Sequence, residues 1–281
     1  MTEPVRWIGF DMDECIASPM PIYTFLRDIP KELVREGQAD MYTEVMYGFT
    51  SLLFESERLH QTHILRPCML DVVHTVWKAF ADKRIEGAFV YSNNSSSELV
   101  NCISFLLNFS IWKLYDPSRP IVFRMASYSG SPCRNGSLVK HFASIQHCLR
   151  DKGLRPCSSI HDLLFFDDLE HILQYEIPHY IRVPPYLQHT DMDTLLANLQ
   201  PLSKFFTSRA WKRVKRNAIS LYIQQPVYPF SVMEMEKEMF VGAIQSFVSQ
   251  DQSAKPIRSR KTLKATRHRQ GTRSNGRRNT L

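Results

Sequence analysis

The sequence has no long apolar run. Its most apolar stretch, residues 102–112, is interrupted by two serines and an asparagine, whereas a membrane-spanning helix needs about 20 consecutive apolar residues. The N-terminal segment also lacks the apolar core of a secretory signal peptide and carries Glu3 and Arg6. We therefore expect no membrane association and an intracellular location, in the nucleus or the cytoplasm. The oligomeric state is left open.

The six cysteines form no CxxC pair and no cluster. Structural zinc sites use closely spaced Cys and His ligands. The nearest approach to such a set is Cys133, His141, His147, Cys148 and Cys157, whose spacing matches no standard zinc pattern. We therefore expect six reduced, partly buried thiols in a reducing compartment.

Acidic residues are absent from residues 255–281, which contain ten Lys and Arg. This end carries a charge of +10, whereas the rest of the chain is net −3, with 25 basic and 28 acidic residues, so the chain as a whole is +7. Residues 251–281 have few apolar side chains, and this composition predicts a disordered tail. A basic tail can serve as a nuclear-import signal or contact nucleic acid through its phosphates. The alternative is a solvated tail without a specific partner.

Short apolar segments alternate with amphipathic helical segments along most of the chain. The expected strands are residues 5–10, 88–91, 121–125, 163–166 and 180–183. The expected helices are residues 69–81, 98–107, 140–150 and 190–206. This alternation predicts an α/β fold with a mostly parallel sheet flanked by helices. Apolar residues at helical spacing within residues 22–63 predict a mainly helical insertion, about residues 20–65, after the first strand.

We expect three parts: an α/β domain over residues 1–208, an extension over residues 209–250, and the basic tail. Within the extension, residues 221–228 are compatible with a strand and residues 233–248 with a helix. A basic cluster around Trp211 consists of Arg209, Lys212, Arg213, Lys215 and Arg216. The extension is either a docking element or a terminal helix packed on the core.

Polar residues directly follow three of the expected strands. They are Asp11 and Asp13, Ser92 and Asn93, and Asp167 and Asp168. Because the carboxyl ends of parallel strands share one edge of a sheet, these groups can converge there. Crowded carboxylates repel one another unless a cation shares the site, and carboxylate ligands suit Mg²⁺. For the serine-rich stretch after residue 91, the alternative is an ordinary helix N-cap.

A metal ion, a lysine and several carboxylates at one sheet edge are suited to phosphoryl transfer. A metal ion and a lysine can neutralise a phosphate so that one aspartate attacks the phosphorus. A second carboxylate can donate a proton to the leaving oxygen and later activate water.

In these motifs and their order the chain resembles the haloacid dehalogenase (HAD) superfamily of phosphohydrolases. More narrowly, it is similar to the phosphatases of the RNA polymerase II C-terminal domain, also called nuclear-LIM-interactor-interacting-factor-like phosphatases. The family's DxDx(T/V) motif is matched by Asp11-Met12-Asp13-Glu14-Cys15, and its RPG helix start by Arg66-Pro67-Cys68. Its strand-end Ser or Thr is matched by Ser92, its lysine by Lys140 and its acidic pair by Asp167-Asp168.

The chain departs from the family pattern in three places. Cys15 replaces Thr or Val, and the Asp-Leu that usually follows the lysine is missing after Lys140. The gap between Lys140 and Asp167 is also long, so Lys152 is a rival for the role of the lysine.

The resemblance implies a role for each site residue. Asp11 would be the nucleophile that forms an aspartyl phosphate and would also bind Mg²⁺. Asp13 would act as general acid and then base, with its backbone carbonyl on the metal. Ser92, Asn93 and Lys140 would hold the phosphate oxygens. Asp167 and Asp168 would hold the metal. Asp168 is favoured as the direct ligand, and Asp167 could instead act through a water molecule or through Lys140.

The resemblance therefore implies a Mg²⁺-dependent, HAD-type Rossmann-like phosphatase that acts on phosphoserine or phosphothreonine of a protein substrate. Two alternatives remain at this point. One is a nucleotide or nucleic-acid end phosphatase, with the basic tail on the polymer. The other is a binding protein that keeps the fold without catalysis.

Overall fold

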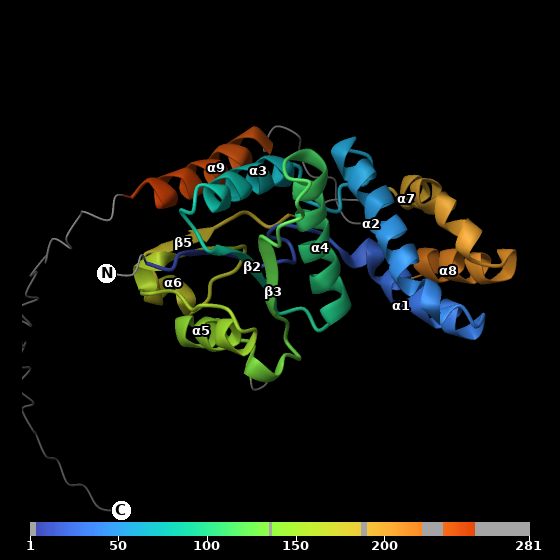
Figure 1. Cartoon of the computed structure of the whole chain (residues 1–281), viewed down its shortest axis with the longest axis horizontal. Coiled ribbons are helices and arrows are strands. Elements are labelled where there is room, and N and C mark those ends of the chain that lie inside the picture. Colours follow the sequence, from blue (N-terminus) through green and yellow to red (C-terminus); the bar gives the residue numbers. More distant parts are fainter. Residues whose placement is uncertain (1–3, 135–136, 187–189, 221–232, 251–281) are drawn as a thin grey trace, which may run out of the picture. The chain divides into compact units, whose positions relative to one another are not determined.

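The computed structural model describes residues 4–134, 137–186, 190–220 and 233–250. Within them, five parallel strands form one sheet in the order β3-β2-β1-β4-β5 (Figure 1). The strands are β1 (Trp7–Phe10), β2 (Gly87–Tyr91), β3 (Phe123–Ser127), β4 (Leu163–Asp167) and β5 (His179–Arg182). The predicted α/β fold with a parallel, helix-flanked sheet is confirmed.

Most of the helices follow the predicted pattern with shifts at their ends, whereas those at residues 173–176 and 208–220 were not predicted. They are α1 (Met20–Arg35), α2 (Tyr42–Arg58), α3 (Met69–Ala81), α4 (Ser97–Leu114), α5 (Phe142–Asp151), α6 (Leu173–Glu176), α7 (Met192–Leu199), α8 (Ser208–Ser220) and α9 (Met233–Ser249). The helix expected over residues 190–206 is α-helical only to Leu199 and continues as a 3₁₀ helix, Gln200–Phe205. Pro201 has no N–H to donate, which explains the change. Among the described residues, no helix combines the length and apolarity needed to cross a membrane.

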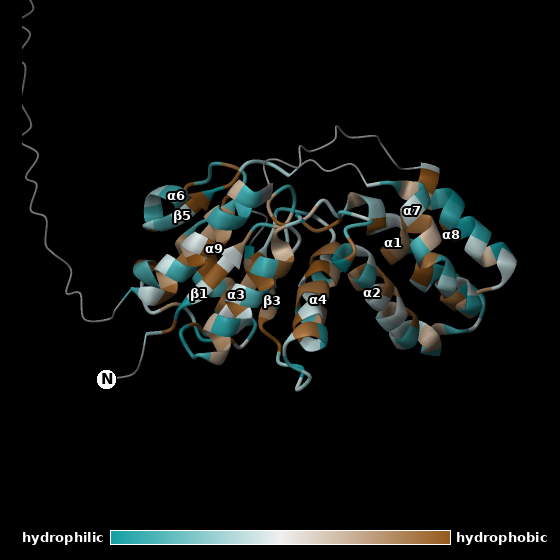
Figure 2. Cartoon of the chain, turned by 90° about the horizontal axis from the view of Figure 1, so that it is seen from above, coloured by the Kyte–Doolittle hydropathy of each residue, from teal (hydrophilic) through white to brown (hydrophobic). Residues whose placement is uncertain are grey.

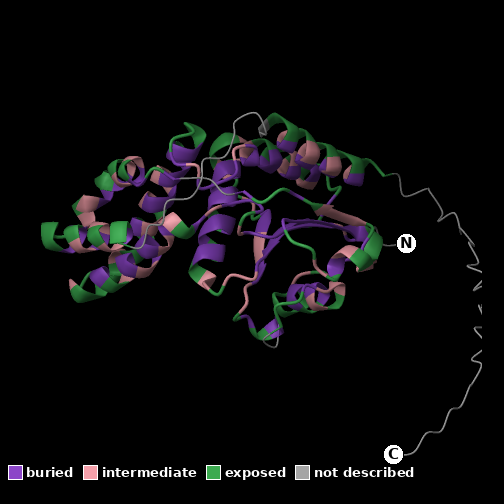
Figure 3. Ribbon diagram, turned by 180° about the vertical axis from the view of Figure 1, so that it is seen from behind, coloured by how far each residue is buried: buried purple, intermediate pink, exposed green. Residues whose placement is uncertain are grey.

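Alternate strand residues pack into two hydrophobic clusters, one on each face of the sheet. Phe10 and Phe166 belong to the larger cluster, together with residues of α3, α4 and α9. Phe89 and Phe165 belong to the smaller cluster, together with residues of α5 and α6. Figure 1 shows α3 and α9 on the side of the sheet opposite α5, and Figure 3 shows most of the sheet buried between them, with the edge strand β5 more accessible.

Gly9 in β1 lies directly beneath two of these aromatic rings. A Cβ atom at this position would lie 2.4 Å from Phe165 Cδ2 and 2.7 Å from Phe89 Cζ. Interiors are close-packed, so the rings have no free space to move into. Glycine is therefore required for the aromatic packing that supports β1.

The predicted helical insertion after β1 is present as α1 and α2. It packs against later helices rather than standing alone, because α1 contacts α8 and α2 contacts α7. Helices α8 and α9 belong to the same compact unit as the sheet. Helix α9 packs on α3 and so covers the core. The expected strand at 221–228 and the expected disordered tail at 251–281 lie outside the described residues.

Candidate active site

The carboxyl ends of β1, β2 and β4 bring the predicted site residues together. Asp11 follows β1 and extends its pairing by one residue, because its N–H donates to Phe166 O at 2.9 Å. Asp167 is the last residue of β4. Both aspartates are buried, so the strand pairing places two carboxylates side by side at the sheet edge.

Lys140 lies between these carboxylates. Its Nζ is 2.7 Å from Asp11 Oδ1 and 2.7 Å from Asp167 Oδ2, and its side chain is 1% exposed. Burial lowers the pKa of Lys140, but the charges of Asp11 and Asp167 outweigh this effect and raise it, so the amine is protonated.

The rival lysine, Lys152, does not reach the site. It is exposed and caps the C-terminal end of α5, whereas Lys140 precedes the N-terminal end of the same helix. A helix of 10 residues spans about 15 Å. The two lysines therefore cannot face the same edge of the sheet.

Asp11, Asp167 and Asp168 form a group that could hold a metal ion. One carboxylate oxygen from each lies within 4.8 Å of the others, and all three residues are buried. Asp168 Oδ1 is buried without a hydrogen-bond partner. A buried, unpartnered carboxylate oxygen costs free energy that a cation would recover. Three carboxylates facing one lysine leave an excess negative charge, so this donor set fits a hard divalent cation such as Mg²⁺.

Burial raises the pKa values of this carboxylate group in the absence of a cation. It raises the pKa of Asp11 to about 7, although the Lys140 charge acts in the opposite direction. Burial, followed by the charge of Asp167, raises the pKa of Asp168 to about 6. A bound cation would favour the ionised forms and displace these protons.

The Asp13 carboxylate is held apart from the metal group by two hydrogen bonds. Ser92 Oγ donates to Asp13 Oδ2 at 3.1 Å, and Asn94 Nδ2 donates to Asp13 Oδ1 at 3.1 Å. Asn94 N also donates to Ser92 Oγ at 2.9 Å, which fixes the hydroxyl. Burial raises the pKa of Asp13, and these hydrogen bonds offset part of the increase. A half-buried carboxyl group of raised pKa is suited to proton transfer.

Asn93 was predicted in the phosphate pocket, but its side chain is engaged elsewhere. Its Oδ1 accepts a hydrogen bond from Arg134 Nη2 at 2.6 Å. Asn94, the next residue, makes the contact to Asp13 instead. The polar run after β2 lies at the site, but the sequence did not distinguish Asn94, which contacts Asp13, from Asn93, which does not.

Two further residues of the site were missed from the sequence. Arg134 is buried and donates from Nη1 to Ser92 O at 2.7 Å. His171 Nε2 lies 3.8 Å from Asp167 Oδ2. Burial, followed by the charge of Lys140, lowers the pKa of His171, so its imidazole is neutral near pH 7. Both residues lie in turns between the predicted elements, where no periodic pattern marks them.

Arg66, the first residue of the RPG-like motif, supports the turn that carries Asp13. It is fully buried, and it donates from Nε to Cys15 O at 2.6 Å and from Nη2 to Glu14 O at 2.9 Å. Its Nη1 forms an ion pair with Glu236 of α9 at 2.6 Å. The C-terminal helix therefore contributes a charge that holds the Asp13 turn in place.

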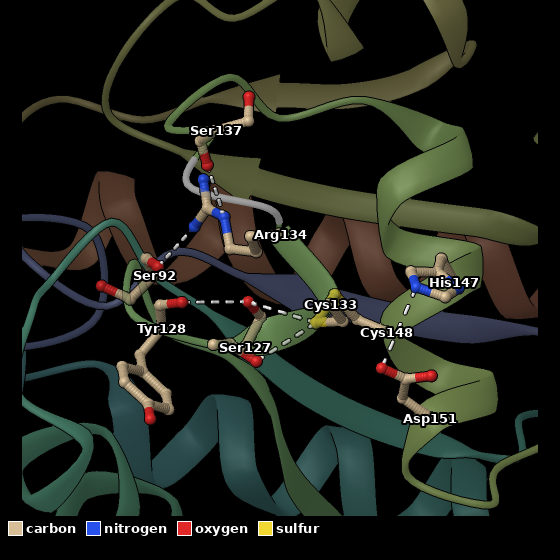
Figure 4. Close-up of a disulfide and its surroundings, with 10 residues drawn as sticks. Ser92, Ser127, Tyr128, Cys133, Arg134, Ser137, His147, Cys148 and Asp151 are labelled. Carbon is tan, nitrogen blue, oxygen red and sulfur yellow. Dashed lines mark hydrogen bonds and ion pairs between the residues drawn. A yellow bond between two sulfur atoms is a disulfide. The ribbon is translucent and has the colours of Figure 1, made fainter.

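The expectation of six reduced thiols is wrong for two of them. Cys133 and Cys148 form a disulfide beside the site (Figure 4). They are 15 residues apart in sequence, and the fold of the turn before α5 brings them together. Cys15, Cys68, Cys102 and Cys157 are free and buried.

Comparisons of the chain with protein-family models, with curated proteins and with solved structures found no match.

Proposed function

We propose that the chain is a Mg²⁺-dependent phosphatase of the haloacid dehalogenase type, which hydrolyses phosphate monoesters through an aspartyl phosphate on Asp11. The observation that carries the proposal is Lys140, buried between Asp11 and Asp167, with Asp168 completing a three-carboxylate group. A neighbouring proton-transfer group, Asp13, is held separately by Ser92 and Asn94. The nucleophile Asp11 then also belongs to the cation site, and the acid is a separate residue held beside them.

Asp11, Asp167 and Asp168 would hold Mg²⁺, which would supply charge neutralisation for the phosphate oxygens. Lys140 would neutralise a further oxygen and keep Asp11 ionised for attack on phosphorus. The Ser92 hydroxyl would donate a hydrogen bond to the phosphate.

Asp13 would donate its proton to the leaving oxygen as the ester bond breaks. It would then take a proton from water, which hydrolyses the aspartyl phosphate. Its raised pKa favours the protonated form that the first step needs.

Two variants test this division of roles with p-nitrophenyl phosphate as substrate. Asp11→Asn should abolish turnover without loss of the fold, and Lys140→Ala should lower kcat by about 10² or more because a charge at the reacting group is lost. Lys152→Ala is the matched control and should retain full activity, since Lys152 is exposed at the far end of α5. Full activity in Asp11→Asn would exclude the covalent mechanism.

A protein substrate is favoured by two hollows near the start of α4, the helix that follows the loop after β2. Glu98, in the first turn of α4, accepts a hydrogen bond from Ser96 Oγ at 3.0 Å. It lines two adjoining hollows of about 280 and 420 Å³, which also share Leu26. The larger hollow is lined by Tyr42, Met46, Tyr47 and Phe105, among others. Such an apolar, aromatic lining suits the side chains of a polypeptide that flank a phosphorylated residue.

The nucleic-acid alternative is favoured by one face of α8. Arg209, Lys212 and Arg216 are exposed and lie at helical spacing on one side, and the helix contains no acidic residue. Figure 2 shows α8 as largely hydrophilic. Such a face can bind phosphates of a polymer.

A panel of phosphopeptides, nucleotides and 3′- or 5′-phosphorylated oligonucleotides, each with and without Mg²⁺, separates the candidates. Faster release from phosphopeptides that carry apolar flanking residues, lost in Phe105→Ala, supports the protein phosphatase. Faster release from oligonucleotides, lost in Arg209→Ala/Lys212→Ala/Arg216→Ala, supports the alternative. Release from none of them would leave a binding protein without catalysis.

A further inference from the structure

The Arg134 guanidinium is buried at the site but faces backbone and amide oxygens rather than a carboxylate. The residue is 3% exposed. It donates to Ser92 O at 2.7 Å, to Asn93 Oδ1 at 2.6 Å and to Ser137 O at 2.9 Å. Figure 4 shows Arg134 reaching from its own turn toward Ser92. The side chain therefore ties the loop after β2 to the segment that leads to Lys140.

The turn that carries Arg134 is short and packs on α5. It is the 3₁₀ turn Pro132–Arg134, in which Pro132 is exposed. Cys133 is buried, and its Sγ lies 3.2 Å from Ser131 Oγ. Its covalent partner, Cys148, is fully buried in α5, against the sheet. The disulfide is thus the link that fastens this turn to the packed core.

The chain between the two cysteines carries both cationic groups of the site. Arg134 is adjacent to Cys133, and Lys140 precedes α5, which holds Cys148. The bridge closes this segment into a loop, which restricts the unfolded chain. Breaking it would leave Arg134 on a three-residue turn held by hydrogen bonds, by packing on α5 and by the Tyr91 ring, whose centroid lies 4.7 Å from the guanidinium carbon, whereas Lys140 would keep its two carboxylate partners.

We propose that the Cys133–Cys148 disulfide holds Arg134 against the loop after β2, so that Arg134 is a positioning residue for the phosphate site and phosphate binding weakens when the disulfide is reduced. This inference rests on the proposed phosphatase function for its kinetic consequence, but its binding consequence does not need turnover. The Ser92 hydroxyl donates to Asp13, and in the proposed mechanism it also contacts the phosphate. A displaced loop therefore loses a phosphate contact and misplaces the acid.

Reduction of the Cys133–Cys148 disulfide is an ordinary thiol–disulfide exchange. A dithiol such as dithiothreitol supplies two electrons and two protons, the S–S bond breaks, and Cys133 and Cys148 become thiols while the dithiol becomes a cyclic disulfide. Because both sulfurs are buried, the turn must open locally before a thiolate can attack.

The test compares oxidised and reduced wild-type protein, with the redox state verified by thiol alkylation and mass spectrometry. Inorganic phosphate affinity is measured by calorimetry in the presence of Mg²⁺, and KM and kcat are measured with p-nitrophenyl phosphate. Reduction should weaken phosphate binding and raise KM by about tenfold, the order expected when a charged hydrogen-bonding group is displaced. Reoxidation should restore both.

Three variants locate the effect. Cys133→Ser/Cys148→Ser should behave as reduced protein whatever reductant is present. Arg134→Lys, which cannot make three directed contacts, should show the weakened binding and no further response to reduction. Cys157→Ser, which changes a free buried thiol of the same hydrophobic cluster, should keep the wild-type redox response. Circular dichroism checks that each variant is folded.

Unchanged phosphate affinity and KM after verified reduction would overturn the inference. So would a redox response that survives in Arg134→Lys. A complete lack of turnover in oxidised protein that still binds phosphate in a redox-dependent way would refute the phosphatase proposal instead, and would leave the positioning role of Arg134 supported.

Discussion

Replacing Lys140 by methionine removes a buried ammonium group that lies 2.7 Å from both Asp11 and Asp167. Methionine has a similar length, so the change tests charge more than volume. Removing one partner of a buried ion pair typically costs about 3–5 kcal/mol because the other charge stays buried and unpaired. We expect a loss of this size in the free energy of unfolding at pH 8 without divalent metal.

The pH dependence of this loss follows from the carboxylates. The Asp11 pKa in the folded protein is already raised by burial to about 7 from 3.8, with Lys140 opposing the increase. Without Lys140 the folded pKa rises further, so the folded state binds more protons than the unfolded state over a wider pH range. Stability of the variant therefore rises as pH falls, and the difference from wild type should shrink toward pH 5.

Urea unfolding at pH 8 and pH 5, with and without Mg²⁺, measures these differences. Mg²⁺ at about 100 times its Kd should restore about 2.7 kcal/mol, if it binds the folded state alone. Lys152→Met is the control, since an exposed substitution changes stability by less than about 0.5 kcal/mol. A loss below about 1 kcal/mol at pH 8 in Lys140→Met, or an equal loss at both pH values, would contradict the reasoning.

Three further predictions follow from other parts of the structure. Mg²⁺ should raise the melting temperature more at pH 8 than at pH 6. Protons compete with the metal ion for Asp11 and Asp168, whose pKa values are about 7 and about 6. An equal rise in melting temperature at both pH values would place the metal elsewhere. Glu57 is buried and accepts hydrogen bonds from the N–H groups of Ile64 and Leu65. Burial raises its folded pKa from 4.5 to about 7, so its contribution to stability falls as pH rises between these values, and Glu57→Gln should flatten the pH profile of urea unfolding there. Gly9→Ala should cost about 1–3 kcal/mol through overpacking against Phe165, and an unchanged unfolding midpoint would mean that the ring can move.

The architecture could be predicted because its signals are local. Met69–Ala81 was recognised as a helix from its apolar face, and the short apolar segments before Asp11, Ser92 and Asp167 were recognised as strands. Parallel strands end at a common edge, so a polar residue after each strand is enough to predict convergence.

The contacts between turns could not be predicted in the same way. Arg134 and Asn94 carry no periodic signal, and their partners depend on how two loops fold over the sheet edge. The disulfide was missed because Cys133 and Cys148 lie in a turn and a helix whose approach is decided by the packing of α5 on the sheet.

The choice between Lys140 and Lys152 could not be made from the sequence. The motifs predict that Lys140 or Lys152 joins a carboxylate edge formed by Asp11, Asp13, Ser92, Asp167 and Asp168. Only the packing of α5 distinguishes the two lysines: Lys140, before the N-terminal end of α5, contacts Asp11, whereas Lys152, at its C-terminal end, is exposed. Local apolar patterns mark where each strand ends, so the residues at the sheet edge can be predicted. Which end of a helix faces that edge depends on how the helix packs on the sheet, and no local pattern marks this.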